Sequence, residues 1–382
     1  MARRALFMLA LCLVVAAPAA AQEADIQAQV HGLILVNAFA NGEAFNNSDV
    51  PQFLLPSAAG GSQPAAGATI RQSRVSVSGL VPEFAGGRLA GEIDVDFFGG
   101  QQPSTGGRTF PLLRLRRAFV ELTRRRLTLF VGQEAPPILE INPSSLASIG
   151  IPEFAGAGNL WLWIPQIRVG ATVATSGAVR VGLELAALAP TSGDPQTAFF
   201  TQPDVAERTS RPYLQSRIRA RWGDGDTQGE VNVGGHYGWL RVGAERIASR
   251  AVAVSVWTPL VRGLELRGEG YTGMALAGLG GGGIGQSFGR DSVAVATTGG
   301  WVQLNARPAA GWEIGAGLAM DDPDDGDLVT STQRLRNLSY EGHAHWRMAP
   351  LVLGAEVRRV ETRYGGETIS GTHANVAFGF EF

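Results

Sequence analysis

The sequence of 382 residues contains no lysine, so all 32 of its basic side chains are arginines. This excludes phosphate loops of the Walker type, lysine Schiff bases and serine–lysine catalytic pairs, because each of them requires a lysine ammonium group. A single cysteine is present, Cys12, and it lies in the N-terminal leader described below. The rest of the chain can therefore form neither a disulfide nor a thiolate metal site.

Long apolar runs are also missing. After the first twenty or so residues, no stretch approaches the roughly 18 consecutive apolar residues that a membrane-spanning helix needs. A polytopic helical membrane protein is thereby excluded. The 32 basic and 34 acidic side chains nearly balance, so we expect no nucleic acid as a partner.

Residues 1–21 have the three parts of a secretory signal peptide. Two arginines form the basic start, residues 6–17 form a short apolar stretch, and residues 19–21 (Ala-Ala-Ala) form a small-residue cleavage site. The apolar stretch is short for a membrane anchor and ends at the cleavage site. We therefore expect export, with residues 22–382 forming one mature domain.

Beyond the leader the dominant hydrophobic period is two, which is typical of strands with one apolar and one polar face. In residues 88–98 the polar face carries three acids, and in residues 211–222 it carries a row of arginines. A soluble sandwich does not account for so many charges on segments of about 10 to 14 residues, roughly twice the usual strand length. A tilted strand of ~10 residues spans the apolar band of an outer membrane. The pattern predicts an all-β fold, a closed transmembrane antiparallel β-barrel with its polar face inside.

About sixteen such segments can be counted, and the even number places both termini on the periplasmic side. Short turns alternate with long loops, as this architecture requires. The expected strands are residues 26–40, 70–80, 88–99, 112–123, 126–133, 166–175, 178–188, 211–222, 228–238, 247–258, 262–276, 293–306, 312–320, 334–348, 351–363 and 370–382.

The end of the chain alternates apolar and small residues and closes on Phe382. In this it resembles bacterial outer-membrane barrels, whose final strand ends in an aromatic residue that the barrel assembly machinery reads. The resemblance implies that Phe382 is an assembly signal. It also implies the cell outer membrane as the location, with lipid and lipopolysaccharide as partners.

Five segments carry a more specific resemblance: RQSRVSVSG (71–79), GEIDVDFFGG (91–100), LLRLRRAFVEL (112–122), VGQE (131–134) and GNLWLWIPQIRVG (158–170). They resemble the DcaP-like trimeric porins, within the wider porin group that includes the phosphate-selective porins, over about a quarter of the chain. The resemblance implies a homotrimer and a channel for small solutes, dicarboxylates among them. Some members have a helical extension before the first strand. Here the first strand begins at residue 26, so no trimer-supporting role of such an extension is carried over.

The loop at residues 134–165 follows the fifth expected strand. In trimeric porins the long loop at that place folds inward and narrows the pore, so we predict an inward-folded constriction loop here. Its prolines and aromatics indicate an ordered loop. The alternative is an extracellular loop packed against a neighbouring loop. The residues that we assign to the constriction are Glu134, Glu140, Glu153, Trp161 and Trp163.

The polar strand faces predict a charged lumen. A row of guanidinium groups there can bind carboxylate or phosphate through paired hydrogen bonds. The alternative, held equal, is that arginine and acid rows form internal salt bridges. The Arg116-Arg117 step breaks the alternation and indicates a bulge. The predicted pore-lining residues are Arg74, Arg114, Arg116, Arg168, Arg180, Arg217, Arg219, Arg221, Glu92, Asp94 and Asp96.

Three further motifs do not define sites. Residues 278–285 contain a formal G-x-G-x-x-G without a following helix, so we expect no nucleotide. The acidic residues 321–327 are interpreted as a solvated loop tip, because Pro323 occupies a calcium-ligand position; loose divalent-ion bridging to lipid phosphates is the alternative. His343 and His345 share a face but have no third convergent ligand in the sequence. We therefore expect no metal and no cofactor.

The preferred function is an outer-membrane porin for passive diffusion of small hydrophilic solutes, with a lean towards small anions such as dicarboxylates, and not an enzyme. One alternative is a non-conducting barrel that serves as an adhesin or structural protein. Another is a barrel hydrolase with a dispersed catalytic set. A conductance measurement separates these three functions, because a pore conducts ions and a non-conducting barrel does not.

Overall fold

The computed structural model describes residues 25–57, 64–99, 111–193 and 203–382. The expected signal peptide lies outside the described residues. The described part is built almost entirely from strands in one sheet. The element α1 (Gly282–Gly285) is a single turn in which Gly283 and Ile284 have left-handed backbone angles. No helix in these ranges has the length and apolar character to cross a membrane.

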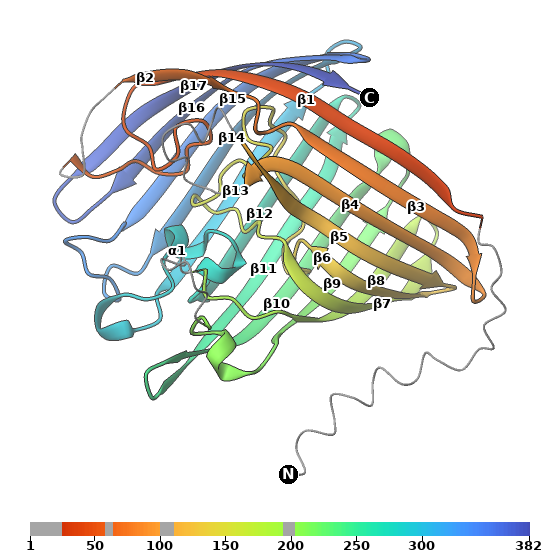
Figure 1. The fold of residues 1–382 in the computed structure, drawn as a ribbon, viewed down its shortest axis with the longest axis horizontal. Helices are drawn as coiled ribbons and strands as arrows, with labels where there is room; N and C mark the ends of the chain where they lie inside the picture. The colour runs from red at the N-terminus through yellow and green to blue at the C-terminus, as the bar shows by residue number, and fades with distance from the viewer. Residues whose placement is uncertain (1–24, 58–63, 100–110, 194–202) are drawn as a thin grey trace.

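Every strand pairs antiparallel with its neighbours, and β1 pairs with β17 to close the sheet into the barrel of Figure 1. The strands are β1 (Gln27–Asn41), β2 (Ala65–Thr69), β3 (Arg74–Phe84), β4 (Gly87–Gly99), β5 (Leu112–Arg124), β6 (Leu127–Glu134), β7 (Ile164–Ser176), β8 (Val179–Leu188), β9 (Tyr213–Trp222), β10 (Gly229–Val242), β11 (Glu245–Val261), β12 (Leu264–Met274), β13 (Ala296–Ala306), β14 (Trp312–Pro323), β15 (Arg336–Met348), β16 (Leu351–Arg363) and β17 (Thr368–Glu381).

The seventeen strands occupy sixteen positions around the barrel, because β2 and β3 share one. Both pair with β1, through Asn37↔Thr69 and Leu33↔Arg74 respectively. Asn37 and Leu33 are four positions apart on β1, whereas their partners Thr69 and Arg74 are five positions apart. A one-residue bulge therefore separates β2 from β3. The predicted count of sixteen is confirmed, and each predicted segment overlaps one position.

The outer face of the barrel is apolar. On β9, Leu214 and Ile218 are 47% and 57% exposed, while Gln215 and Arg217 between them are buried. This alternation follows from the membrane, since an arginine facing lipid at the bilayer midplane costs ~2–4 kcal/mol. The exposed apolar side chains therefore form the lipid-facing surface, as the period of two predicted.

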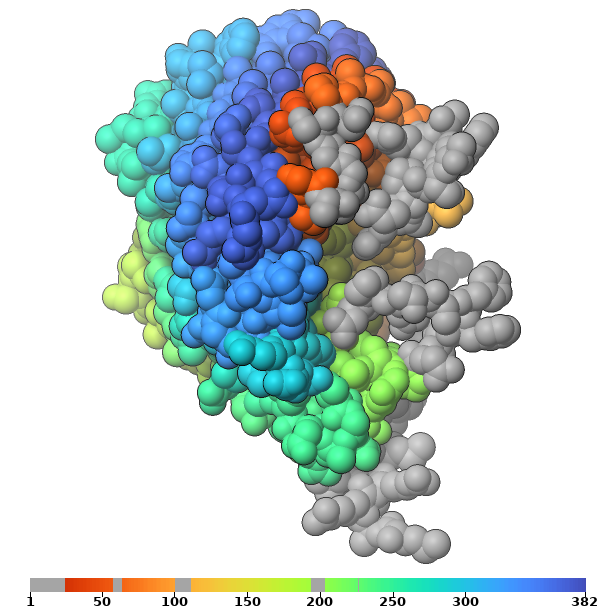
Figure 2. All heavy atoms as spheres, turned by 90° about the vertical axis from the view of Figure 1, so that its left-hand side faces the viewer, coloured from red at the N-terminus to blue at the C-terminus, as the bar shows by residue number. Residues whose placement is uncertain are grey.

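The connections divide the barrel into two ends. Short turns such as residues 125–126 and 349–350 lie at the end where β1 begins and β17 ends, here called the terminal rim. Longer connections lie at the opposite end, the loop rim. Figure 2 faces the loop rim. The first loop, whose described part is residues 42–57 after β1, appears there in red-orange directly against blue C-terminal residues. This contact includes the Tyr364 hydroxyl, which donates to the carbonyl of Leu54 at 2.7 Å.

Strand β5 contains a bulge, and strand β14 extends further than the sequence pattern predicted. The pairing register between β4 and β5 shifts between Asp94 and Val95, so the predicted bulge at Arg116-Arg117 is confirmed. The interpretation of residues 321–327 as a loop tip is wrong for residues 321–323, which belong to β14 and pair with β13. Asp321 is fully buried there, and its carboxylate accepts hydrogen bonds from Thr297 and Tyr271.

Candidate functional site

The segment between β6 and β7, residues 135–163, lies inside the barrel (yellow in Figure 1). Without a sheet of its own, the segment must satisfy its backbone polar groups by other partners. Inward-facing side chains from widely separated parts of the wall supply them. The backbone N–H donors and their acceptors are Ile138 to Gln215, Ile141 to Glu269, Ser144 to Gln303, Leu146 to Glu356 and Ile149 to Gln72.

Glu140 anchors the first half of this segment to the wall. Its carboxylate accepts hydrogen bonds from Arg217 and Arg219 of β9 and lies 3.4 Å from a guanidinium nitrogen of Arg168 on β7. Glu184 of β8 pairs with the same guanidiniums, including a 3.1 Å bond from Arg217 Nε. Burial alone raises the pKa of Glu140, but Arg217 and Arg168 outweigh it and bring the pKa below its ordinary value of 4.5.

Glu153 anchors the second half. Arg358 of β16 donates to its carboxylate at 2.7 Å, and the same guanidinium donates to the Ser148 hydroxyl at 2.6 Å and the Pro51 carbonyl at 2.7 Å. One arginine therefore joins the interior segment, the first loop and the wall. A guanidinium with hydrogen bonds to three different partners is suited to fixing geometry.

The three acids of β4 face three arginines of β5. The ion pairs are Asp96–Arg114 at 2.5 Å, Asp94–Arg116 at 3.5 Å and Glu92–Arg117 at 2.9 Å. Arg117 also pairs with Glu134 at 2.5 Å, so the bulge turns two consecutive arginines towards carboxylates.

Two tryptophans of the interior segment pack beside this ladder. The guanidinium carbon of Arg116 lies 4.6 Å from the centre of the Trp163 ring, a cation–π distance. Trp161 meets Trp163 edge-on, with 5.3 Å between ring centres. The aromatic pair thus holds the end of the segment against β5.

Other arginines lack such pairing. Among the described residues, Arg74 and Arg180 have no carboxylate oxygen within 4 Å, and both are exposed. Arg180 lines a cavity of about 460 Å³ near the terminal rim, whose walls carry five arginines and three glutamates. Arg74 lines a second cavity of about 420 Å³. Glu140 borders both cavities.

All eleven predicted pore-lining residues face the interior, but they divide into two kinds. Arg217 is 1% exposed and enclosed by its ion pairs, whereas the side chain of Arg221 is 45% exposed despite a 2.9 Å bond to Glu230. Arg358 also faces the interior and was not among the predicted residues, although the alternation of polar and apolar residues along β16 indicates it. Arg117 was not among them either, because strict alternation turns it towards lipid and only the bulge turns it inward.

These features define a class of protein: an antiparallel barrel of the outer-membrane porin type, apolar outside and ionised inside. Among solved structures, the outer membrane channel DcaP of Acinetobacter baumannii is similar, with a TM-score of 0.72, 16% identity and coverage of 94% of this chain and 99% of that one. An anion-selective porin from Comamonas acidovorans has a TM-score of 0.58 at 12% identity, covering 94% and 100%.

A trimer form of OmpT, an outer membrane protein of Vibrio cholerae, has a TM-score of 0.54 at 8% identity, covering 94% and 99%. No family model matches the chain, and no curated protein matches it. At these identities the likeness establishes the fold. With the apolar outer face, it places the barrel in the outer membrane, as the sequence analysis predicted.

Proposed function

We propose that the chain is a porin that forms a water-filled channel for passive diffusion of small hydrophilic solutes, and that it catalyses no reaction. The observation that carries this proposal is the closed barrel with an apolar outside and an interior of ionised groups around cavities. Ionised side chains are stable in an interior when they are paired or in contact with water.

We infer that residues 135–163 form the constriction. The segment crosses the interior between its two anchors, Glu140 beside β7–β9 and Glu153 beside β16. Because Glu140 borders both cavities described above, a solute that moves from one to the other passes its carboxylate and the guanidiniums around it.

The charge of the larger cavity favours anions. Its five arginines outnumber its three glutamates, and Arg180 has no carboxylate partner among the described residues. Fixed positive charge in a low-dielectric wall raises the local concentration of anions. The pairing of forked guanidinium groups with carboxylates, together with the resemblance to DcaP-like porins, points to small dicarboxylates as solutes.

A planar bilayer containing the purified mature protein tests this function. We expect stepwise single-channel currents, an anion-selective reversal potential in a salt gradient, and a lower chloride current when a dicarboxylate such as succinate is added. A folded barrel without current would refute the channel and favour the adhesin or structural alternative. Cation selectivity would refute the anion preference alone.

We further propose a homotrimer, supported by the resemblance to trimeric porins and by the trimer form of OmpT. Chemical cross-linking in detergent and mass measurement of the intact complex test it. A purely monomeric mass under conditions that preserve folded barrel would overturn this proposal.

A further inference from the structure

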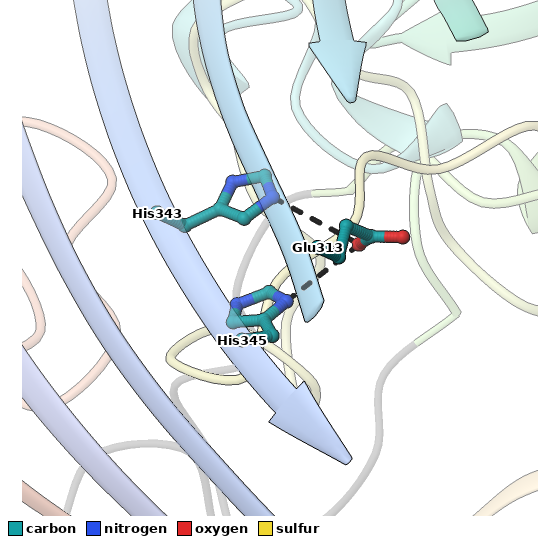
Figure 3. Close-up of side chains that lie close together, drawn as sticks. All are labelled: Glu313, His343 and His345. Carbon is teal, nitrogen blue, oxygen red and sulfur yellow. Dashed lines mark ion pairs between the residues drawn. The ribbon is translucent and has the colours of Figure 1, made fainter. Parts of the chain in front are cut away.

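Three side chains on neighbouring strands meet inside the barrel wall. Glu313 of β14 lies directly opposite His345 of β15, and His343 lies two residues further along the same strand. The two imidazole rings stack with 4.3 Å between their centres and turn one nitrogen each towards the Glu313 carboxylate (Figure 3). Both rings are almost fully buried, at 4% and 1% exposure.

The spacing of these atoms suits a metal ion better than direct hydrogen bonds. Glu313 Oε1 lies 3.9 Å from His343 Nε2 and 3.7 Å from His345 Nδ1. Both distances exceed hydrogen-bonding range, and both nitrogens are buried without a hydrogen-bond partner among the described residues. Two ligands ~2.1 Å from a tetrahedral Zn²⁺ lie about 3.4 Å apart, so these two distances need to shorten by only a few tenths of an ångström. All three ligand atoms lie within 4.8 Å of one another.

The opposite ring nitrogens are held by carboxylates. His343 Nδ1 lies 3.2 Å from Glu341 Oε2, and His345 Nε2 lies 2.9 Å from Glu356 Oε1. A hydrogen on each of these nitrogens, donated to its carboxylate, leaves the two inward nitrogens with free lone pairs. A carboxylate behind each ligating histidine is the usual outer arrangement of protein zinc sites.

The surroundings also position the third ligand. Arg307 donates to Glu313 Oε2 at 3.2 Å. The Ser144 hydroxyl of the interior segment donates to Glu313 Oε1, and this oxygen keeps a second lone pair that can bind a metal ion. Gly315, opposite His343, makes room for the ring: a Cβ there would lie 2.6 Å from His343 Nε2. It would also lie 2.4 Å from Asn305 Oδ1, a buried oxygen without a partner among the described residues that borders the same space.

We propose that Glu313, His343 and His345 form a binding site for a divalent transition metal ion of the Zn²⁺ class. Two imidazole nitrogens and one carboxylate oxygen are a ligand set of zinc sites that keep a fourth position open. Neutral imidazoles disfavour Mg²⁺ and Ca²⁺, which prefer oxygen ligands. Glu313 also lines a cavity of about 630 Å³ at the terminal rim, which gives the ion a route in. A bound ion would tie β14 and β15 to the interior segment at Ser144.

Cobalt titration of the full mature barrel in detergent tests the site, because Co²⁺ accepts the same ligands as Zn²⁺ and absorbs visible light when bound. We expect one equivalent of Co²⁺ with visible absorption, displaced by Zn²⁺. Glu313→Gln and His345→Gln should each weaken binding at least tenfold. Gly315→Ala should do the same by displacing the His343 ring. Zn²⁺ should raise the heat stability of the wild type and not of these variants.

His236→Gln is the matched control. This histidine is also buried on the inner face, but both of its nitrogens have partners, Gln215 at 3.1 Å and Ser249 at 3.0 Å. We expect its metal binding to equal that of the wild type. Absence of stoichiometric binding in the folded wild type would overturn the proposal. Equal binding by wild type, Glu313→Gln and His345→Gln would also overturn it, because the metal would then sit elsewhere.

Discussion

Replacing Glu140 by glutamine separates the two roles that the structure gives this residue. Its carboxylate anchors the interior segment to Arg217 and Arg219, and its charge offsets the arginines of the adjoining cavity. Exposed ion pairs contribute ~0–1 kcal/mol and breaking a fully buried pair costs ~3–5 kcal/mol. Because the Glu140 side chain is 29% exposed, we expect a loss of about 2 kcal/mol of stability, between these limits.

The electrostatic effect can be worked out separately. Loss of one unit charge about 10 Å from a permeating anion, in surroundings of dielectric constant near 80, changes the anion's energy by about 0.4 kcal/mol, or roughly twofold in local concentration. The shift should be largest at low ionic strength, where the Debye length is at least 10 Å. Glu140→Gln should therefore move the reversal potential towards stronger anion selectivity and lower the temperature at which folded barrel is lost on a gel.

Glu121→Gln provides the matched comparison. Glu121 lines the same cavity, and its replacement by glutamine removes the same charge. Among the described residues, however, Glu121 has no arginine partner. It should shift selectivity to a similar extent without loss of heat stability. If Glu140→Gln is as heat-stable as Glu121→Gln, the anchoring role is refuted. If neither variant changes selectivity, the cavity does not lie on the permeation path.

Three further predictions follow from individual side chains. Arg180→Gln should weaken anion selectivity at unchanged stability because this guanidinium is exposed. Arg217→Gln should lower the unfolding temperature because it leaves Glu140 and Glu184, which are only 29% and 20% exposed, without this ion pair. Paired selectivity and melting measurements check both. Since Glu140 has a pKa below 4.5, its stabilisation is fully present above that pH and lost as the pH falls further, so the stability difference between wild type and Glu140→Gln should vanish in acid. Deleting Phe382 should lower insertion into the outer membrane with export intact, measured by surface protection in membrane fractions. Gly32→Val should act in the same direction because a Cβ at Gly32 would lie 2.2 Å from the Phe382 ring, and normal insertion of both would count against the terminal signal.

The strands could be predicted because a membrane barrel requires alternate residues of each strand to be apolar where they face lipid. Leu214 and Ile218 face lipid and Arg217 and Arg219 face inward on this rule alone. Even the exception was visible, since two consecutive arginines on β5 require a bulge if neither is to face lipid.

The partners of the inward side chains could not be predicted. Glu140 lies in a segment without periodicity, so nothing in its sequence places it between Arg168 and Arg217. Glu313 and the two histidines of β15 meet only because of the pairing register between β14 and β15. A shift of this register by one residue would turn Glu313 to the outer face. The length of the loop between β14 and β15 does not by itself determine the register.

The interior segment has a consequence for the order of folding. Its hydrogen-bond partners lie 77 residues away at Gln215, 128 at Glu269, 159 at Gln303 and 210 at Glu356. Contacts of such separation have a higher loop-closure entropy cost than the pairing of neighbouring strands, so we expect them to form after that pairing. All four of these attachments can exist only when β9, β12, β13 and β16 have taken their places in the wall. The attachment at Glu356 requires β16, so a truncation before that strand leaves residues 135–163 without it.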